Sequence, residues 1–158
     1  MWITIVRHAR AGDKRTWDGP DRLRPLDPLG QRHADDLASL LAPYAVRRVI
    51  SSPTTRCVQT VTPLADAVHV PIELWDELGP DGHSSRIVTC FGHPAFDDSV
   101  LCTHGELMRP LLRTDDLRRL VRSTGLRRAT LMTKGAAWRL HISDAGRATG
   151  LELIAPRA

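Results

Sequence analysis

Short runs of β-branched and apolar residues alternate along this chain with segments of helical periodicity. The runs that predict strands lie at residues 2–6, 48–52, 70–75, 99–103 and 150–154, with a further pair at 129–133 and 137–143. The segments that predict helices lie at residues 27–43, 53–68, 84–91 and 106–122. We expect Pro63 to shorten or kink the second helix and Pro110 to interrupt the fourth. This alternation is typical of an α/β domain, here a three-layer α/β/α sandwich with a central, mainly parallel sheet.

Length and composition predict one globular domain over residues 1–158. A chain of 158 residues can bury a substantial core, and 42% hydrophobic with 25% charged residues excludes wholesale disorder, collagen and coiled coil. The three cysteines are widely spaced and form no CxxC pair, so they indicate small core residues in a reducing compartment. The apolar run at the N-terminus is too short for a signal peptide, and no stretch is long enough to span a membrane. We therefore expect a cytoplasmic protein with no membrane partner.

The charge balance favours an anionic ligand. The chain carries a net charge of +4, and only Lys14 and Lys134 of its 22 basic residues are lysines. Arginine forms bidentate contacts with phosphate and carboxylate groups. The basic stretch at residues 118–128 is interpreted as a solvated helix face, and aromatic residues make up only 4% of the chain. A nucleic-acid partner, which would need stacking platforms, is not expected.

Two predicted strands end in histidine. Arg7-His8 follows the first strand and Thr103-His104 follows the strand at 99–103. In a mainly parallel sheet, ligands bind beyond the carboxyl ends of the strands. Arg56, near the start of a predicted helix, would be disfavoured by the helix dipole unless an anion is bound there. The long irregular segment at residues 9–26 is of a length that is often functional.

Together, Arg7, His8, Arg56 and His104 are suited to phosphoryl transfer to an imidazole. One histidine must be neutral, with a backbone carbonyl accepting from one ring nitrogen so that the other aims its lone pair at phosphorus. Nearby guanidiniums would lower the pKa of that imidazole and neutralise the phosphoryl oxygens. This chemistry needs no metal, and we expect no cofactor.

Three blocks of the sequence resemble the histidine phosphatase superfamily, which has the phosphoglycerate-mutase-like fold. They are Val6-Arg7-His8-Ala9, then Ser51-Ser52-Pro53 with Arg56, Gln59 and Thr60, then Thr103-His104-Gly105-Glu106. The resemblance is to short members of the family, including phosphohistidine phosphatases and phosphatase-like domains fused to Nudix hydrolases. It implies that His8 is the phosphorylated nucleophile and that Arg7, Arg56 and His104 form the phosphate pocket. Ala9 stands where the family usually has glycine, and it fits only if that position needs no positive φ.

An ester leaving group would require a carboxylic acid near the pocket. Asp76, Glu77 and Asp81 are candidates, and the resemblance favours Glu77. A phosphohistidine or anhydride substrate, which has a good leaving group, makes this acid dispensable. Arg10, Lys14, Arg15 and Trp17 form a candidate substrate loop that could grip a polyanion, and a solvated loop is the equal alternative.

These observations predict a metal-independent phosphatase that acts on a phosphate ester, a nucleotide phosphate or a phosphohistidine. Its partner would be a phosphorylated small molecule or a phosphoprotein. The alternative is a phosphate-binding or phosphoprotein-binding module of the same fold that has lost turnover. Ala9 and the uncertain acid are the features that favour this alternative.

Overall fold

The structure is a computed structural model that describes residues 1–157. Its centre is one six-stranded sheet in the order β3-β2-β4-β1-β5-β6. The strands are β1 (Trp2–Arg7), β2 (Arg48–Ser51), β3 (Ile72–Leu74), β4 (Ser99–Thr103), β5 (Ala137–Ile142) and β6 (Ala148–Ile154). The first four are mutually parallel, whereas β5 runs antiparallel to both β1 and β6. The predicted α/β class is therefore confirmed. The sheet is mixed, because β3, β2, β4 and β1 are parallel and the β5–β6 hairpin adds antiparallel pairing next to β1.

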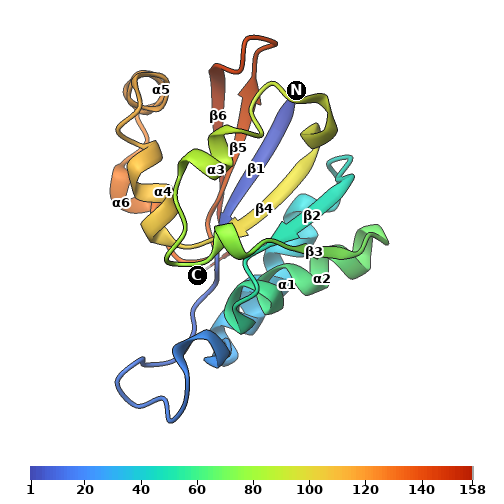
Figure 1. Ribbon diagram of the computed structural model, residues 1–158, viewed down its shortest axis with the longest axis vertical. Helices are drawn as coiled ribbons and strands as arrows, with labels where there is room; N and C mark the ends of the chain where they lie inside the picture. Colours follow the sequence, from blue (N-terminus) through green and yellow to red (C-terminus); the bar gives the residue numbers. More distant parts are fainter. Residues whose placement is uncertain (158) are drawn as a thin grey trace.

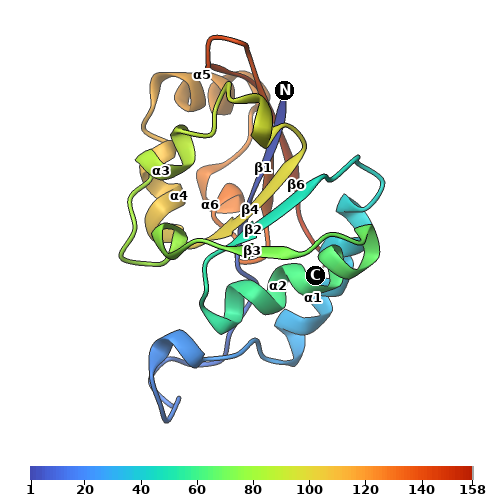
Figure 2. The ribbon, with the colours of Figure 1, turned by 45° about the vertical axis from the view of Figure 1, so that its right-hand side comes forward.

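Helices cover both faces of this sheet (Figures 1 and 2). One face carries α1 (Pro28–Leu41) and α2 (Thr55–Val68), and the other carries α3 (Ser85–Val88), α4 (Gly105–Leu111), α5 (Asp115–Thr124) and α6 (Arg128–Leu131). Three 3-10 turns lie at Asp21–Leu23, Asp76–Leu78 and Pro94–Phe96.

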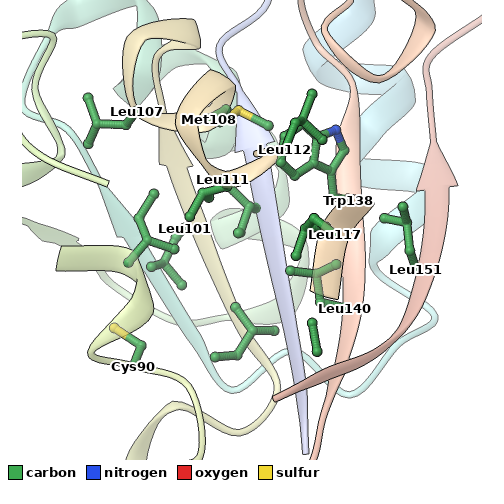
Figure 3. Packing of buried hydrophobic residues seen from close by; sticks show 14 of the residues in the cluster. Cys90, Leu101, Leu107, Met108, Leu111, Leu112, Leu117, Trp138, Leu140 and Leu151 are labelled. Carbon is green, nitrogen blue, oxygen red and sulfur yellow. The ribbon is translucent and has the colours of Figure 1, made fainter. Parts of the chain in front are cut away.

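The two faces of the sheet have separate hydrophobic cores because side chains alternate along each strand. In β1, Ile3 and Ile5 are buried in the cluster under α3 to α6, whereas Val6 is buried in the cluster under α1 and α2. Figure 3 shows the first cluster, in which the fully buried Trp138 of β5 packs among leucines of α4 and α5. The site described below is built on strands that are buried on both sides.

The helix α2 continues through Pro63, so the expected shortening was wrong. The residues after the proline, Leu64 and Ala65, are buried against the core, and this packing outweighs the one hydrogen bond that proline removes. The helical region at 106–122 is interrupted as predicted, because α4 ends at Leu111 and α5 begins at Asp115.

The predicted strand at 129–133 is also wrong, because these residues form α6 and the turn that follows it. Leu131 is fully buried and its carbonyl accepts a hydrogen bond of 2.7 Å from the indole nitrogen of Trp138. Tertiary packing under Trp138 therefore overrides the local strand preference of this segment. The hairpin partner of β5 is β6 instead.

The first residue of the chain belongs to the sheet at the end opposite to the site. The amino group of Met1 donates to the carbonyl of Ile142 at 2.9 Å, and the amide of Ile142 donates back to the carbonyl of Met1 at 2.8 Å.

Within residues 1–157, no helix is long and apolar enough to cross a membrane.

Candidate active site

The two histidines meet because their strands are neighbours. β1 and β4 pair in parallel with Arg7 opposite Thr103, so His8 and His104 leave the sheet at the same edge. The amide of His8 donates to the carbonyl of Thr103 at 3.1 Å. The two ring centroids lie 5.1 Å apart, and the rings are inclined by 61°. The strand register thus brings together residues that are 96 positions apart in the sequence.

The ring of His8 is held in one tautomer. Its Nδ1 lies 2.8 Å from the carbonyl oxygen of Ala9, and because a carbonyl can only accept, Nδ1 carries the hydrogen. The lone pair of the neutral ring is therefore on Nε2. Burial lowers the pKa of His8 to about 3, with smaller contributions from His104, Arg56 and Arg7, while the bond to Ala9 opposes this shift. The predicted effect of the guanidiniums is present, but burial contributes more.

Ala9 causes no backbone strain. Among the non-glycine residues of 1–157, only His69 and Asp98 have a positive φ, so the conformation at Ala9 does not require glycine. Its side chain is fully buried, and its amide donates to Oγ1 of Thr60 at 2.9 Å. The absence of glycine at position 9 is therefore no longer an argument for the alternative, a phosphate-binding module that has lost turnover.

Arg7 is fixed from two sides. Its Nη1 donates to the carbonyl of Met132, which directly follows α6, and its Nε is buried without a partner among the described residues. Gly105, the first residue of α4, lies against the guanidinium so closely that a Cβ there would be 3.1 Å from Cζ. Burial lowers the pKa of Arg7, Glu106 raises it and Arg109 lowers it. The guanidinium is thus held rigidly with donor capacity to spare.

Arg56 lies at the start of α2 and is only 4% exposed. Its Nη1 donates to the carbonyl of Asp21 at 2.8 Å, and its Nη2 donates to the Asp21 carboxylate at 3.1 Å. Nε of Arg56 is buried, and no described residue accepts from it. Thr54, the N-cap of α2, makes no side-chain cap, so the first amides of the helix also remain available to an anion.

His104 is oriented by three side chains that the sequence analysis did not assign to it. Its Nε2 lies 3.0 Å from Oγ of Ser52, 3.4 Å from Oγ1 of Thr54 and 3.5 Å from Sγ of Cys57. The signal in the sequence was the Ser51-Ser52-Pro53 block. It lies at the end of β2, and because β2 pairs in parallel with β4, its hydroxyl groups lie next to His104 at the end of β4. His104 is 1% exposed, so these contacts to Nε2 fix the orientation of its ring.

These groups line one pocket of about 620 Å³. Arg7, His8, Arg56 and His104 all contribute to it, and so do the predicted residues Lys14 and Asp81. The other charged residues of the lining are not marked as pocket residues by any motif of the sequence: Asp21, Arg22, Arg24, Glu106 and Lys134. The pocket has the size and charge to hold a phosphorylated ligand.

Five predicted residues lie outside this lining, three of them in the candidate substrate loop. Arg10 pairs with Asp27 at 2.6 Å, Arg15 pairs with Asp13 at 2.9 Å, and the Trp17 indole donates to the carbonyl of Pro20 at 3.0 Å. Of the candidate substrate loop, only Lys14 therefore faces the pocket.

The other two are the candidate acids Asp76 and Glu77, which lie along a neighbouring hollow of about 540 Å³. The Glu77 carboxylate faces Arg86 at 3.8 Å. Asp81 lines both hollows, so it is the candidate acid that the structure places beside the histidines.

The arrangement can bind a tetrahedral anion and present a nucleophile to it. His8, whose Nε2 carries the lone pair, shares the pocket with two guanidiniums and a second imidazole, which are the groups that attack on a phosphoryl group requires. Within residues 1–157, no group of three or more His, Cys, Asp or Glu side chains could hold a metal ion.

Comparisons with known proteins agree with this description. Residues 3–79 match the histidine phosphatase superfamily (branch 1). The chain is 31% identical, over 98% of its length, to an 8-oxo-(d)GTP phosphatase of Mycolicibacterium smegmatis, and it spans about half (48%) of that relative.

Solved structures of two small proteins share the fold. The protein histidine phosphatase SixA complexed with tungstate has a TM-score of 0.75 at 21% identity, covering 99% of this chain and 97% of that one. A putative phosphohistidine phosphatase SixA from Agrobacterium tumefaciens also has a TM-score of 0.75, at 20% identity, covering 99% and 98%. At these identities the likeness concerns the fold, and it confirms the predicted architecture over nearly the whole chain.

Proposed function

The chain belongs to the histidine phosphatase superfamily, and on that premise we propose that it is a phosphatase that works through a phosphorylated His8. Its substrate would be a phosphate ester, a nucleotide phosphate or a phosphohistidine. The observation that carries the proposal is the ring of His8. Its Nδ1 is bound to the Ala9 carbonyl and the ring lies 5.1 Å from that of His104, in a pocket shared with two guanidiniums.

In the first step, Nε2 of His8 attacks phosphorus in line with the leaving group. The new N–P bond forms as the bond from phosphorus to the leaving atom breaks, and the electron pair departs with that atom, which is oxygen in an ester or nucleotide phosphate and nitrogen in a phosphohistidine. Arg7, Arg56 and His104 donate to the other phosphoryl oxygens, where the charge of the transition state must be stabilised. Because His8 is neutral, it needs no general base to begin the reaction.

In the second step, water attacks the phosphohistidine from the side vacated by the leaving group. The N–P bond breaks, its electron pair returns to Nε2, and inorganic phosphate is released. For an ester substrate, we assign protonation of the leaving oxygen in the first step to Asp81, which lines the pocket, in place of Glu77. The same carboxylate could then accept a proton from the attacking water.

Hydrolysis of p-nitrophenyl phosphate by wild type and by His8→Ala tests this proposal. We expect turnover in the presence of a metal chelator, and a loss of more than about 1,000-fold in His8→Ala, because removal of a nucleophile abolishes the covalent route. His69→Ala is the matched control, because its imidazole is exposed and outside the pocket. Rapid quenching followed by mass spectrometry should detect a phosphoryl group on the peptide that contains His8.

Two outcomes would overturn the proposal. If His8→Ala retains the wild-type rate, His8 is not the nucleophile. If wild type binds orthophosphate or tungstate but cleaves no ester, anhydride or phosphohistidine, the chain is the binding module that the sequence left as the alternative.

A further inference from the structure

The pocket carries more positive charge than one phosphoryl group uses. Its lining holds six cationic side chains and three carboxylates. Arg7 and Arg56 belong to the phosphate pocket, and Arg24 already donates to the carbonyls of Ala11 and Gly12 and to the Asp21 carboxylate. The remaining cations are Lys14, Arg22 and Lys134, which are exposed to solvent.

Lys134 has positive neighbours and no ion pair with any carboxylate within residues 1–157. Although Lys134 is exposed to solvent, partial desolvation lowers the pKa of its ammonium group, and the guanidiniums of Arg7, Arg24, Arg10 and Arg56 lower it further. An ammonium group that four guanidiniums destabilise, and that forms no ion pair with a carboxylate, is stabilised when an anion binds beside it. The structure therefore places an unsatisfied cation beside the phosphate pocket.

The backbone holds Lys134 in this position. The amide of the next residue, Gly135, lies 3.0 Å from the carbonyl of Arg7 and 3.1 Å from that of His8. On the other side, two residues before Lys134, the carbonyl of Met132 accepts a hydrogen bond from the guanidinium of Arg7. Lys134 is thus fixed between two contacts to the residues that bind the transferred phosphoryl group.

We propose that Lys134, together with Lys14 and Arg22, forms a second anion subsite, and that the substrate is a phosphoric anhydride such as a nucleoside diphosphate or inorganic pyrophosphate. This inference rests on the proposed function and names its substrate class. One phosphoryl group binds at His8, and the phosphate that leaves binds at Lys134. The anhydride P–O bond breaks as the bond to Nε2 forms, so the leaving group is a phosphate that needs little protonation.

An anhydride does not depend on the candidate acids, of which Asp81 alone lines the pocket. Glu77, the acid that the family resemblance favoured, faces Arg86 outside the pocket. A phosphomonoester of a neutral alcohol, or a phosphohistidine on a protein, would bring no second anion to Lys134. The surplus cations therefore favour an anhydride over both.

Binding in a His8→Ala background tests the subsite without turnover. Calorimetric titration should show that inorganic pyrophosphate binds about 10- to 100-fold more tightly than orthophosphate, the range expected for one charge-assisted contact. Lys134→Met should remove most of this preference, and Lys134→Arg should restore it. Arg47→Met removes an exposed cation far from the pocket lining and should leave the preference unchanged.

Turnover provides the second measurement, with pyrophosphate, ADP and p-nitrophenyl phosphate as substrates. Lys134→Met should lower kcat/KM for the two anhydrides about 10-fold more than for p-nitrophenyl phosphate. A preference for ADP would identify a nucleotide as the source of the anhydride, and a preference for pyrophosphate would identify an inorganic substrate. Equal binding of pyrophosphate and orthophosphate, or equal losses for all substrates in Lys134→Met, would overturn the subsite even if the phosphatase activity is established.

Discussion

Replacing Gly105 by alanine should damage the phosphate pocket without damaging the fold. A Cβ at this position would lie 3.1 Å from Cζ of Arg7 and 3.2 Å from its Nε and Nη2. These separations are a few tenths of an ångström shorter than ordinary carbon contacts. The guanidinium cannot retreat freely, because its Nη1 is held by the carbonyl of Met132. Arg7 must therefore either shift or give up this hydrogen bond.

The size of the effect follows from the role we propose for Arg7, which is to donate to the transferred phosphoryl group. A hydrogen bond to a charged partner contributes about 1.5–3 kcal/mol. Loss of one such bond in the transition state lowers kcat/KM by about 10- to 100-fold. Stability should change in the other direction, since alanine is favoured over glycine by up to about 1 kcal/mol within a helix and Gly105 is the first residue of α4. Activity and stability should thus separate.

The assay is kcat/KM for p-nitrophenyl phosphate alongside the midpoint of thermal unfolding. Gly12→Ala is the matched control, because a Cβ at Gly12 would have no neighbour within 4 Å. We expect the control to retain wild-type activity. An active Gly105→Ala variant would refute the reasoning, because Arg7 would then have room that the structure does not show. A midpoint that falls together with the activity would mean instead that the helix is damaged.

Three further predictions follow from single contacts. The pKa of His8 is lowered from 6.5 to about 3, so below about pH 6.5 the unfolded chain binds a proton at this residue and the folded chain does not. Wild type should therefore lose about 2 kcal/mol of unfolding free energy between pH 7 and about pH 5, and His8→Asn should not suffer this loss. Urea unfolding of both proteins at the two pH values measures the difference, and a difference that does not change with pH would contradict the buried neutral ring. Asp21→Asn removes the negative charge that is bound to Arg56, so the guanidinium should attract an anion more strongly. Orthophosphate should then inhibit ester hydrolysis by this variant several-fold more strongly than it inhibits wild type, and an unchanged inhibition constant would disprove this reasoning. Asp81→Asn should slow ester hydrolysis by about 10- to 100-fold whereas Glu77→Gln should not, and the reverse ranking would restore Glu77 as the acid.

The sheet and the pairing of the two histidines could be predicted because both depend on local pattern. Each buried strand is an apolar run, and parallel neighbours end at the same edge, so Arg7-His8 and Thr103-His104 were placed together without coordinates. The segment at 129–133 failed for the opposite reason. Its helical state depends on burial of Leu131 beneath Trp138, a contact that no local pattern reveals.

The charged lining of the pocket could not be predicted from pattern alone. Lys134 reaches it because Gly135 is hydrogen-bonded to the carbonyls of Arg7 and His8, a contact between distant parts of the chain. Asp21 reaches it through the 3-10 turn inside the segment that the sequence showed only as a loop. Trp17 was an attractive candidate by residue type, but its indole is bonded within the same loop. Loop conformation, rather than composition, decides which of these side chains contacts a ligand.

The pairing of Met1 with Ile142 has a practical consequence for handling this protein. β1 carries His8 at one tip, and its six residues separate that tip from Met1 by about 20 Å. Figure 1 shows the N-terminus at the far end of this strand from the loop that borders the pocket. An affinity tag or fluorophore fused ahead of Met1 would keep an amide hydrogen for the carbonyl of Ile142, and it would emerge where it cannot obstruct ligand entry. Surface immobilisation through that end should accordingly leave the pocket accessible to dissolved ligands.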